Sequence, residues 1–256
     1  MGTRFADPNC RNDTAARKPQ SFSGERRDPT LAPWAAMDTT GYGLIETMRV
    51  RAGRIPFLER HLARLERALS ELGLPRPSRD LRALVAPFSG TGDAVLRVDV
   101  SDGRATVTVR EFAPLDPPAV ITASEPHEPY PFKTTQRDCF DDAAREANVA
   151  EADDALLLTH DGWAAEGTVW SVFWWDADHL YTPALELQVL PGVGRGRVLE
   201  LGPAVETRAR RAELDGKSLF LVNAVQGVVR IASLDGAPVP RHARTAGLAE
   251  RFWPPE

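Results

Sequence analysis

Lysine is almost absent from this sequence. Of its 31 basic residues all but three are arginines, and the lysines are Lys18, Lys133 and Lys217. A lysine can lose its proton and act as a nucleophilic amine, which an arginine cannot do. Lys18 lies in a polar N-terminal stretch where we expect it to be solvated. Lys133, in the stretch YPFKTTQRD, is therefore either a chance surface lysine or a residue needed for this chemistry.

Cysteine is also scarce, with two positions, Cys10 and Cys139. Two cysteines are too few for a disulfide framework, which favours a reducing cytosol. No apolar run approaches the length of a membrane span, and the polar N-terminus lacks the apolar core of a secretory signal. We therefore expect a cytoplasmic protein without a membrane partner.

An excess of positive charge is missing as well. The formal net charge is −5 with both signs interspersed, so no basic stripe indicates a nucleic-acid partner. The five histidines show no metal-ligand spacing with cysteines or carboxylates. Neither nucleic acid nor a metal ion is therefore expected to bind.

The first part of the chain differs in composition from the rest. Residues 1–36 are rich in Arg, Asp, Pro, Ser and Gly and have no periodic apolar face, which predicts a disordered tail. An interaction segment is the alternative. Met37 follows this tail directly, so translation starts either at Met1 or at Met37.

Residues 37–125 predict a small α/β lobe. The stretch LIETMRV indicates a strand, and a helix at about 58–72 follows from the i, i+4, i+7 spacing of its leucines. A short helix at about 78–88 and a hairpin from AVLRVDV to ATVTVREF complete it. The Pro-rich stretch APLDPPAVITASEPHEPYP predicts a crossover to a second lobe.

Residues 126–256 predict the larger lobe, which contains Lys133. We expect a helix at about 136–149, the strands DALLLT, TVWSVFWW and HLYTP, and a helix from about Val193. The stretch GKSLFLVNAVQGVVRI predicts a strand, a loop and a strand, and RHARTAGLAERFW a terminal helix. The whole is an α+β fold in two lobes with many antiparallel hairpins.

A lysine that forms an imine needs a lowered pKa and a carbonyl partner. Pyridoxal phosphate, a common partner, also requires an acid opposite its ring nitrogen and a cup for its phosphate. The stretch AEGT offers Glu166, and LPGVGRG places glycines at a helix start, where free N–H groups favour a phosphate. Each signal is weak alone, because a lone Glu is usually a surface residue and Pro-Gly before a helix is usually a turn.

Together these signals belong to a longer series of stretches in a fixed order. The series is GLIETMRV, FLERHLARL, FKTTQR, DDALLLTHDGWAAEGTVWSVF, LYTPAL, LPGVGRGRVLEL and LVNAVQG. It resembles the class IV aminotransferases, the fold-type IV pyridoxal-phosphate enzymes, over roughly residues 41–235. The resemblance implies a two-lobed fold like that of D-amino-acid aminotransferase, a cofactor site between the lobes, a small-molecule substrate and a homodimer.

The resemblance also implies roles for single residues. Lys133 is expected to be the Schiff-base lysine and proton shuttle, and Glu166 to pair with the pyridine nitrogen. Arg64, which the helix pattern alone places on a solvated face, is expected to bind the phosphate. Backbone N–H groups of Val193 and Gly194 are expected to complete the phosphate cup, although position 194 often carries Thr in the family.

The loop at Asn223 and Ala224 is expected on the phosphate side, where transaminases often place Thr, and Asn-Ala is closer to the lyase pattern. Ser171 stands where the family usually has Asn, and the bulky Trp170 precedes it. This departure changes the side chains that support the cofactor site locally. An NG turn common ahead of the ET-R motif is not visible, as in lyase modules.

The resemblance favours a 4-amino-4-deoxychorismate lyase, which releases pyruvate and gives 4-aminobenzoate, a folate precursor. The alternative is a transaminase acting on a branched-chain or D-amino acid or an amine. Arg97 matches a position where some transaminases hold the substrate carboxylate, and an outward-facing strand residue is an equal interpretation. A family member without catalysis is a minor alternative, which the presence of Lys133, Glu166 and Arg64 opposes.

Overall fold

The first sheet supplies one wall of the candidate site. The computed structural model describes residues 41–88 and 92–255, so the predicted tail and Met37 lie outside the described residues. Within them, β1 (Leu44–Val50), β2 (Ala94–Ser101) and β3 (Arg104–Glu111) form an antiparallel sheet in that order. Alternate residues of a strand face opposite sides. Glu46 therefore faces α1 (Leu58–Glu71), whose side chains it contacts, and Thr47 faces the opposite side of the sheet.

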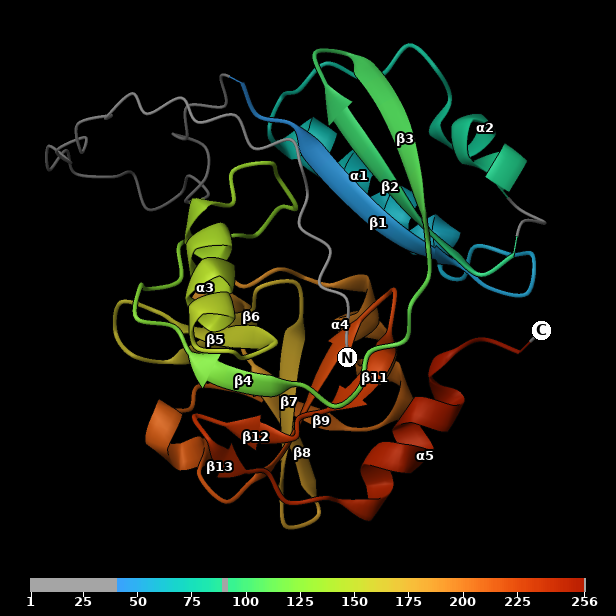
Figure 1. Cartoon of the computed structure of the whole chain (residues 1–256). Coiled ribbons are helices and arrows are strands. Elements are labelled where there is room, and N and C mark those ends of the chain that lie inside the picture. The colour runs from blue at the N-terminus through green and yellow to red at the C-terminus, as the bar shows by residue number, and fades with distance from the viewer. Residues whose placement is uncertain (1–40, 89–91, 256) are drawn as a thin grey trace, which may run out of the picture. The chain divides into compact units, whose positions relative to one another are not determined.

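The helix predicted at about 58–72 is confirmed as α1, which packs along β1 (Figure 1). The helix predicted at about 78–88 is wrong in its bounds. It is a shorter helix, α2 (Leu81–Val85), followed by one 3₁₀ turn, η1 (Ala86–Phe88). The side chain of Asp80 accepts a hydrogen bond of 2.7 Å from the Ala83 N–H, and this cap fixes the later start.

The remaining strands of the described chain form two five-stranded sheets. One has the order β11-β10-β7-β8-β9, and the other has the order β13-β12-β4-β5-β6. The strands of the first are β7 (Ser171–Asp176), β8 (His179–Pro183), β9 (Ala204–Thr207), β10 (Ser218–Asn223) and β11 (Gly227–Arg230). The strands of the second are β4 (Ala119–Thr122), β5 (Asp154–Leu158), β6 (Ala164–Gly167), β12 (Ser233–Leu234) and β13 (Ala237–Pro238).

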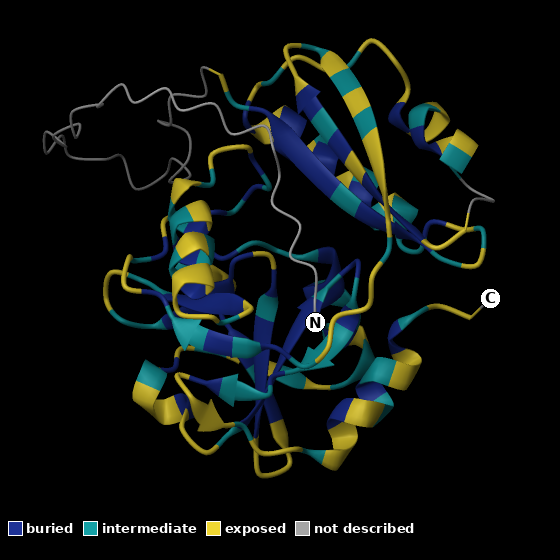
Figure 2. Cartoon of the chain, viewed as in Figure 1, coloured by how far each residue is buried: buried dark blue, intermediate teal, exposed yellow. Residues whose placement is uncertain are grey.

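Helices cover these sheets, and short 3₁₀ turns link some strands (Figure 1). The remaining helical segments are α3 (Asp138–Val149), η2 (Leu185–Leu187), α4 (Val193–Leu201), η3 (Arg211–Leu214) and α5 (Ala243–Phe252). The rings of Phe173 and Phe220 stack 5.3 Å apart, and Phe252 of α5 is buried in the same cluster. Burial is concentrated in strands such as β1, β6, β7 and β10, whereas most of β3 is exposed (Figure 2).

The stretch TVWSVFWW is not the single strand that its composition predicts. The chain turns at residues 168–170, so β6 joins one five-stranded sheet and β7 joins the other. Asp154 holds this turn, because its carboxylate accepts hydrogen bonds from the N–H and hydroxyl groups of Thr168 at 2.9 and 3.1 Å. Glu166 consequently lies close to the end of β6 and next to the turn.

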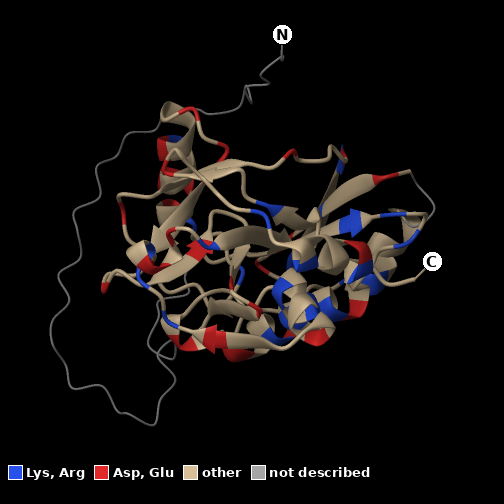
Figure 3. Ribbon diagram, turned by 90° about the horizontal axis from the view of Figure 1, so that it is seen from below, with Lys and Arg blue, Asp and Glu red and all other residues tan. Residues whose placement is uncertain are grey.

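The lobe boundary at residues 125 and 126 stays a prediction. Although β4 precedes that boundary in sequence, it pairs in parallel with β5, which follows it. Basic and acidic residues are interspersed along the described elements (Figure 3). No helix in the described part of the chain is long and apolar enough to cross a membrane.

Candidate active site

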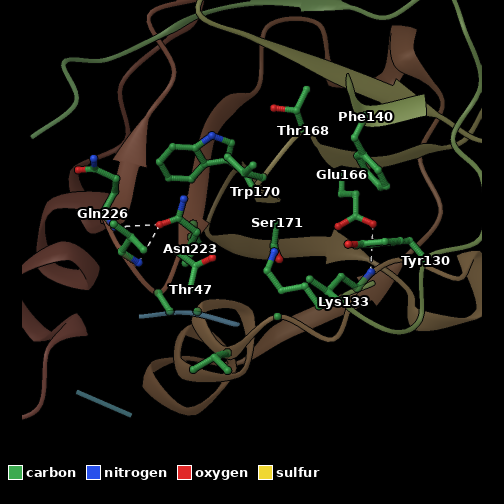
Figure 4. A pocket seen from close by; sticks show the side chains of 18 of the residues that line it. Thr47, Tyr130, Lys133, Phe140, Glu166, Thr168, Trp170, Ser171, Asn223 and Gln226 are labelled. Atoms are coloured by element: carbon green, nitrogen blue, oxygen red, sulfur yellow. Dashed lines mark hydrogen bonds between the residues drawn. The ribbon is translucent and has the colours of Figure 1, made fainter. Parts of the chain in front are cut away.

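A cavity of about 230 Å³ gathers most of the residues that the sequence singled out. Its lining includes Arg64, Lys133, Glu166, Val193, Gly194, Asn223 and Ala224. Figure 4 shows Lys133, Glu166 and Tyr130 toward one end of the cavity and Asn223 and Gln226 toward the other. Seven of the eight predicted site residues thus meet around one space, although they lie up to 160 positions apart: residues 64 to 224.

Lys133 is held in the cavity by its backbone. Its carbonyl accepts a hydrogen bond of 2.8 Å from the Ile45 N–H, and the Thr135 N–H donates to Gly43 at 2.9 Å. The segment after the crossover is thereby fixed to the start of β1. Burial of the amino group lowers the pKa of Lys133 to about 7, and the nearby positive charges of Arg64 and Arg137 add to the effect. A large fraction of the amine is therefore neutral near neutral pH, as a nucleophile requires.

Glu166 is buried and held by two neighbours. Its Oε1 accepts a hydrogen bond of 3.1 Å from the Leu190 N–H and lies 2.9 Å from Nε2 of His127. The His127 ring is itself buried and contacts Phe140 edge-on, with ring centroids 5.6 Å apart. These contacts fix the carboxylate at the cavity wall, where it is able to face a ring nitrogen.

Arg64 is held by a buried carboxylate. Its Nε and Nη2 donate to the two oxygens of Glu46 at 2.8 and 2.7 Å, and Nδ1 of His61 lies 2.7 Å from the same carboxylate. Burial alone would raise the pKa of Glu46, but the charges and hydrogen bonds of Arg64 and His61 lower it to about 2. The side chain of Arg64 is only 11% exposed, so the solvated-face interpretation of the helix pattern is wrong.

The end of the cavity near α4 has the features of a phosphate site. Val193 and Gly194 begin α4, and first-turn N–H groups of a helix lack partners within the helix. A Cβ at Gly194 would lie 2.8 Å from the backbone of Asn223, so only glycine allows this close approach. This packing explains why Gly194 carries no Thr side chain. The adjoining loop is ordered, because Oδ1 of Asn223 accepts from the N–H groups of Val225 and Gln226 at 2.9 and 2.8 Å.

His61 provides a second indication that the cavity takes a polar group. Its Nε2 is buried and has no hydrogen-bond partner among the described residues, while the ring lines the cavity. Buried polar atoms are rarely left without a partner. The residues present therefore fit pyridoxal phosphate. Its phosphate suits the start of α4, its ring nitrogen suits the carboxylate of Glu166, and its aldehyde suits the amine of Lys133.

The sequence also singled out Arg97 and Ser171, and the structure places the two differently. Arg97 of β2 is not among the lining residues; its side chain is half exposed and binds Asp99 at 2.7 to 2.9 Å. Its carboxylate-binding role stays a prediction. Ser171 does line the cavity, and a Cβ at Gly192 would lie 3.0 Å from its hydroxyl, so the two positions pack closely.

The sequence motifs assign no role to several lining or supporting residues, namely Glu46, His61, Arg110, His127, Tyr130 and Arg137. His61 could have been found, because it lies three positions before Arg64 and thus on the same helix face. Glu46 lies within the matched stretch GLIETMRV. His127 gave no signal, since nothing in a Pro-rich segment indicates which side chain will turn inward.

Comparison with known proteins identifies the family of the chain. The sequence model of the family described as Amino-transferase class IV matches residues 43–234. The chain belongs to this family. The resemblance inferred from the seven motifs is confirmed, and so is the expected enzyme class.

The relatives of the chain include both lyases and aminotransferases. A curated aminodeoxychorismate lyase from Bacillus subtilis is 25% identical over 82% of this chain and 84% of its own length. A branched-chain aminotransferase structure from Thermoproteus uzoniensis has a TM-score of 0.75 at 24% identity, covering 83% of this chain and 84% of that one. A hypothetical aminotransferase from Mycobacterium tuberculosis, in its PLP-bound form, has a TM-score of 0.74 at 24% identity, covering 90% and 94%. These structures confirm the predicted mixed α and β fold.

Within the described residues, no group of three or more His, Cys, Asp or Glu side chains is arranged to hold a metal ion.

Proposed function

We propose that this class IV, pyridoxal-phosphate-dependent enzyme is a 4-amino-4-deoxychorismate lyase, which forms 4-aminobenzoate and releases pyruvate. The observation that carries the chemistry is the partly buried Lys133, with a pKa lowered to about 7, in one cavity with the fixed carboxylate of Glu166. The similarity to the Bacillus subtilis lyase and the Asn223–Ala224 loop support the choice of reaction.

Each site residue has a task in this proposal. Pyridoxal phosphate, when bound, supplies an aldehyde for amines and a ring that accepts an electron pair. Arg64, held by Glu46, binds the phosphate together with the N–H groups of Val193 and Gly194. Glu166, held by His127, keeps a proton on the ring nitrogen, which strengthens the ring as an electron acceptor.

Lys133 moves the protons. Its neutral Nζ accepts the proton from the ring carbon that carries the substrate amine, and a proton is returned to the methylene carbon of the departing enolpyruvyl group. The carbon–oxygen bond breaks, pyruvate leaves and the six-membered ring becomes aromatic. The atoms of the substrate equal those of the two products, so neither water nor an oxidant is needed.

The test is a paired assay on the purified protein loaded with pyridoxal phosphate. With aminodeoxychorismate as substrate, pyruvate and 4-aminobenzoate should appear in equal amounts, and Lys133→Ala should form neither. Amination of keto acids without pyruvate release would overturn the lyase assignment.

A transaminase acting on a branched-chain or D-amino acid is the second candidate. The similarity to the Thermoproteus uzoniensis branched-chain aminotransferase structure supports it. Lys133 would serve both reactions, since each needs a mobile base beside the same electron acceptor. Transamination additionally needs a keto acid, so the dependence of turnover on added keto acid separates the two.

We also propose a homodimer, as the resemblance implies. Light scattering of the purified protein tests this proposal, with a mass of twice 28.1 kDa expected. A non-catalytic member of the family would keep the fold and fail in both assays.

A further inference from the structure

Arg137 is a largely buried cation, and its one ion pair among the described residues is long and exposed. It precedes the first residue of α3, and its side chain is 15% exposed. Its Nη2 donates to the Thr168 carbonyl at 2.6 Å, and its Nη1 donates to the Tyr130 hydroxyl at 3.3 Å. Both acceptors are uncharged. The carboxylate of Asp141 is 3.8 Å from Nε and two-thirds exposed, so it neutralises the guanidinium weakly.

The charges that line the cavity leave Arg137 without a partner there. Glu166 is the lining carboxylate among the described residues, and it is already bound to His127 and Leu190. Arg64 is matched by Glu46. A guanidinium that has lost most of its water and has only a distant, exposed carboxylate beside it gains strongly from an entering anion.

The aromatic neighbours of Arg137 indicate the shape of that anion. The guanidinium carbon lies 4.9 Å from the ring centre of Phe140 and 5.7 Å from that of Tyr130, and both rings line the cavity together with Trp170. These flat apolar surfaces suit a flat six-membered ring. The hydrogen bonds to Thr168 and Tyr130 hold the guanidinium in place, so little conformational freedom is lost when a carboxylate binds.

We propose that Arg137 binds the carboxylate on the six-membered ring of the substrate, and thereby takes the recognition role that the sequence suggested for Arg97. This inference rests on the proposed lyase function, because that substrate carries its carboxylate on a ring. Arg137 contacts the substrate in this account and takes no part in the proton transfers.

The test compares two ligands that differ in one charge. Binding of 4-aminobenzoate and of its uncharged counterpart 4-aminobenzamide to the holoenzyme is measured by calorimetry, for the wild type and for Arg137→Gln and Arg137→Lys. The wild type should bind the acid at least about tenfold more tightly than the amide. Arg137→Gln should reduce that ratio to about one, and Arg137→Lys should keep part of it.

The matched control is Arg104→Gln. Arg104 is an exposed arginine of β3 that does not line the cavity, so its replacement should leave the ratio unchanged. The absorbance spectrum of the ligand-free holoenzyme should also be the same in the wild type and in Arg137→Gln.

Three outcomes overturn the proposal. A ratio that persists in Arg137→Gln shows that another residue binds the carboxylate. A shifted spectrum of the ligand-free holoenzyme with the ratio retained places Arg137 at the cofactor. An equal loss of acid and amide binding with a lower melting temperature assigns it a structural role. Because binding is measured without turnover, failure of the lyase reaction in the paired assay remains a separate result.

Discussion

Nε2 of His127 lies 2.9 Å from the Oε1 atom of Glu166, and both side chains are buried. An exposed pair of the same type occurs between His160 and Glu128, at 3.0 Å with both side chains more than 60% exposed. A buried group that loses its partner is costly, whereas a solvated pair contributes little. The two histidines therefore allow a matched test of what the buried contact does.

His127→Phe keeps a ring against Phe140 but removes one of the two partners of Glu166, and the Leu190 N–H remains. We expect a loss of about 1–3 kcal/mol in the free energy of unfolding and at least a tenfold lower kcat of the holoenzyme. Chemical denaturation and steady-state kinetics measure the two effects. His160→Phe should change the free energy of unfolding by less than about 1 kcal/mol and leave kcat unchanged. Equal effects of the two substitutions would contradict a special role of His127.

The lowered pKa of Lys133 predicts how fast the cofactor is taken up. An amine attacks an aldehyde in its neutral form, so the rate at which apoprotein combines with pyridoxal phosphate should rise with pH through about 7 and then level off. Stopped-flow absorbance measures this rate. Lys133→Ala should show no such phase, and Lys217→Ala, whose lysine binds the exposed Asp176, should behave as the wild type. A midpoint near the ordinary lysine value would contradict the account.

Glu46 should determine both cofactor affinity and acid stability. Its folded pKa, about 2, is below the ordinary value of 4.5, so its ionised form contributes stability above pH 4.5 that is lost as the pH falls towards 2. Glu46→Gln leaves Arg64 without its carboxylate, and we expect about 3–5 kcal/mol of destabilisation at neutral pH and a flatter loss of stability between these pH values. The exposed Glu59, bound to Arg82, supplies the control Glu59→Gln.

Denaturation at several pH values and titration with pyridoxal phosphate test this prediction. If Glu46→Gln unfolds at neutral pH, Glu46→Asp keeps the charge and tests cofactor affinity in a folded protein. Unchanged affinity in a folded variant would show that Arg64 does not depend on Glu46.

Gly194 should be required for tight binding of pyridoxal phosphate, and Gly196 should not. A Cβ at position 194 meets the Asn223 backbone at 2.8 Å, whereas nothing lies within 4 Å of a Cβ at position 196. Gly194→Ala must push α4 away from that loop, and we expect at least a tenfold rise in the Kd of pyridoxal phosphate. Gly196→Ala should leave the Kd unchanged, because it adds a methyl group to the same helix without a contact. Similar Kd values for both variants would show that the phosphate does not bind here.

The elements with a periodic pattern could be predicted from sequence, and the inward or outward direction of single side chains could not. The leucines of α1 define a face, and the helix follows from them. The break at residues 168–170 depends on hydrogen bonds to Asp154, which lies 14 positions earlier, so no local pattern in TVWSVFWW reveals it.

The lining of the cavity shows the same division. Family motifs place Lys133, Glu166 and Gly194 in order along the chain, and all three line the cavity. The resemblance indicates a carboxylate-binding role for Arg97, but the strand pattern is equally consistent with an inward and an outward side chain, and no motif assigns a role to Arg137. Tertiary contacts decide this direction, and in the structure Arg97 pairs with Asp99 while Arg137 turns into the cavity.

The central claim is that Lys133 carries the cofactor, and reduction of the holoenzyme with borohydride tests it most directly. Reduction converts the imine into a stable amine bond, and peptide mass spectrometry then locates the added mass. We expect one label for each chain, on Lys133, and none in the Lys133→Ala variant. A label on Lys18 or Lys217, or an unlabelled Lys133 in a protein that retains its cofactor, would contradict it.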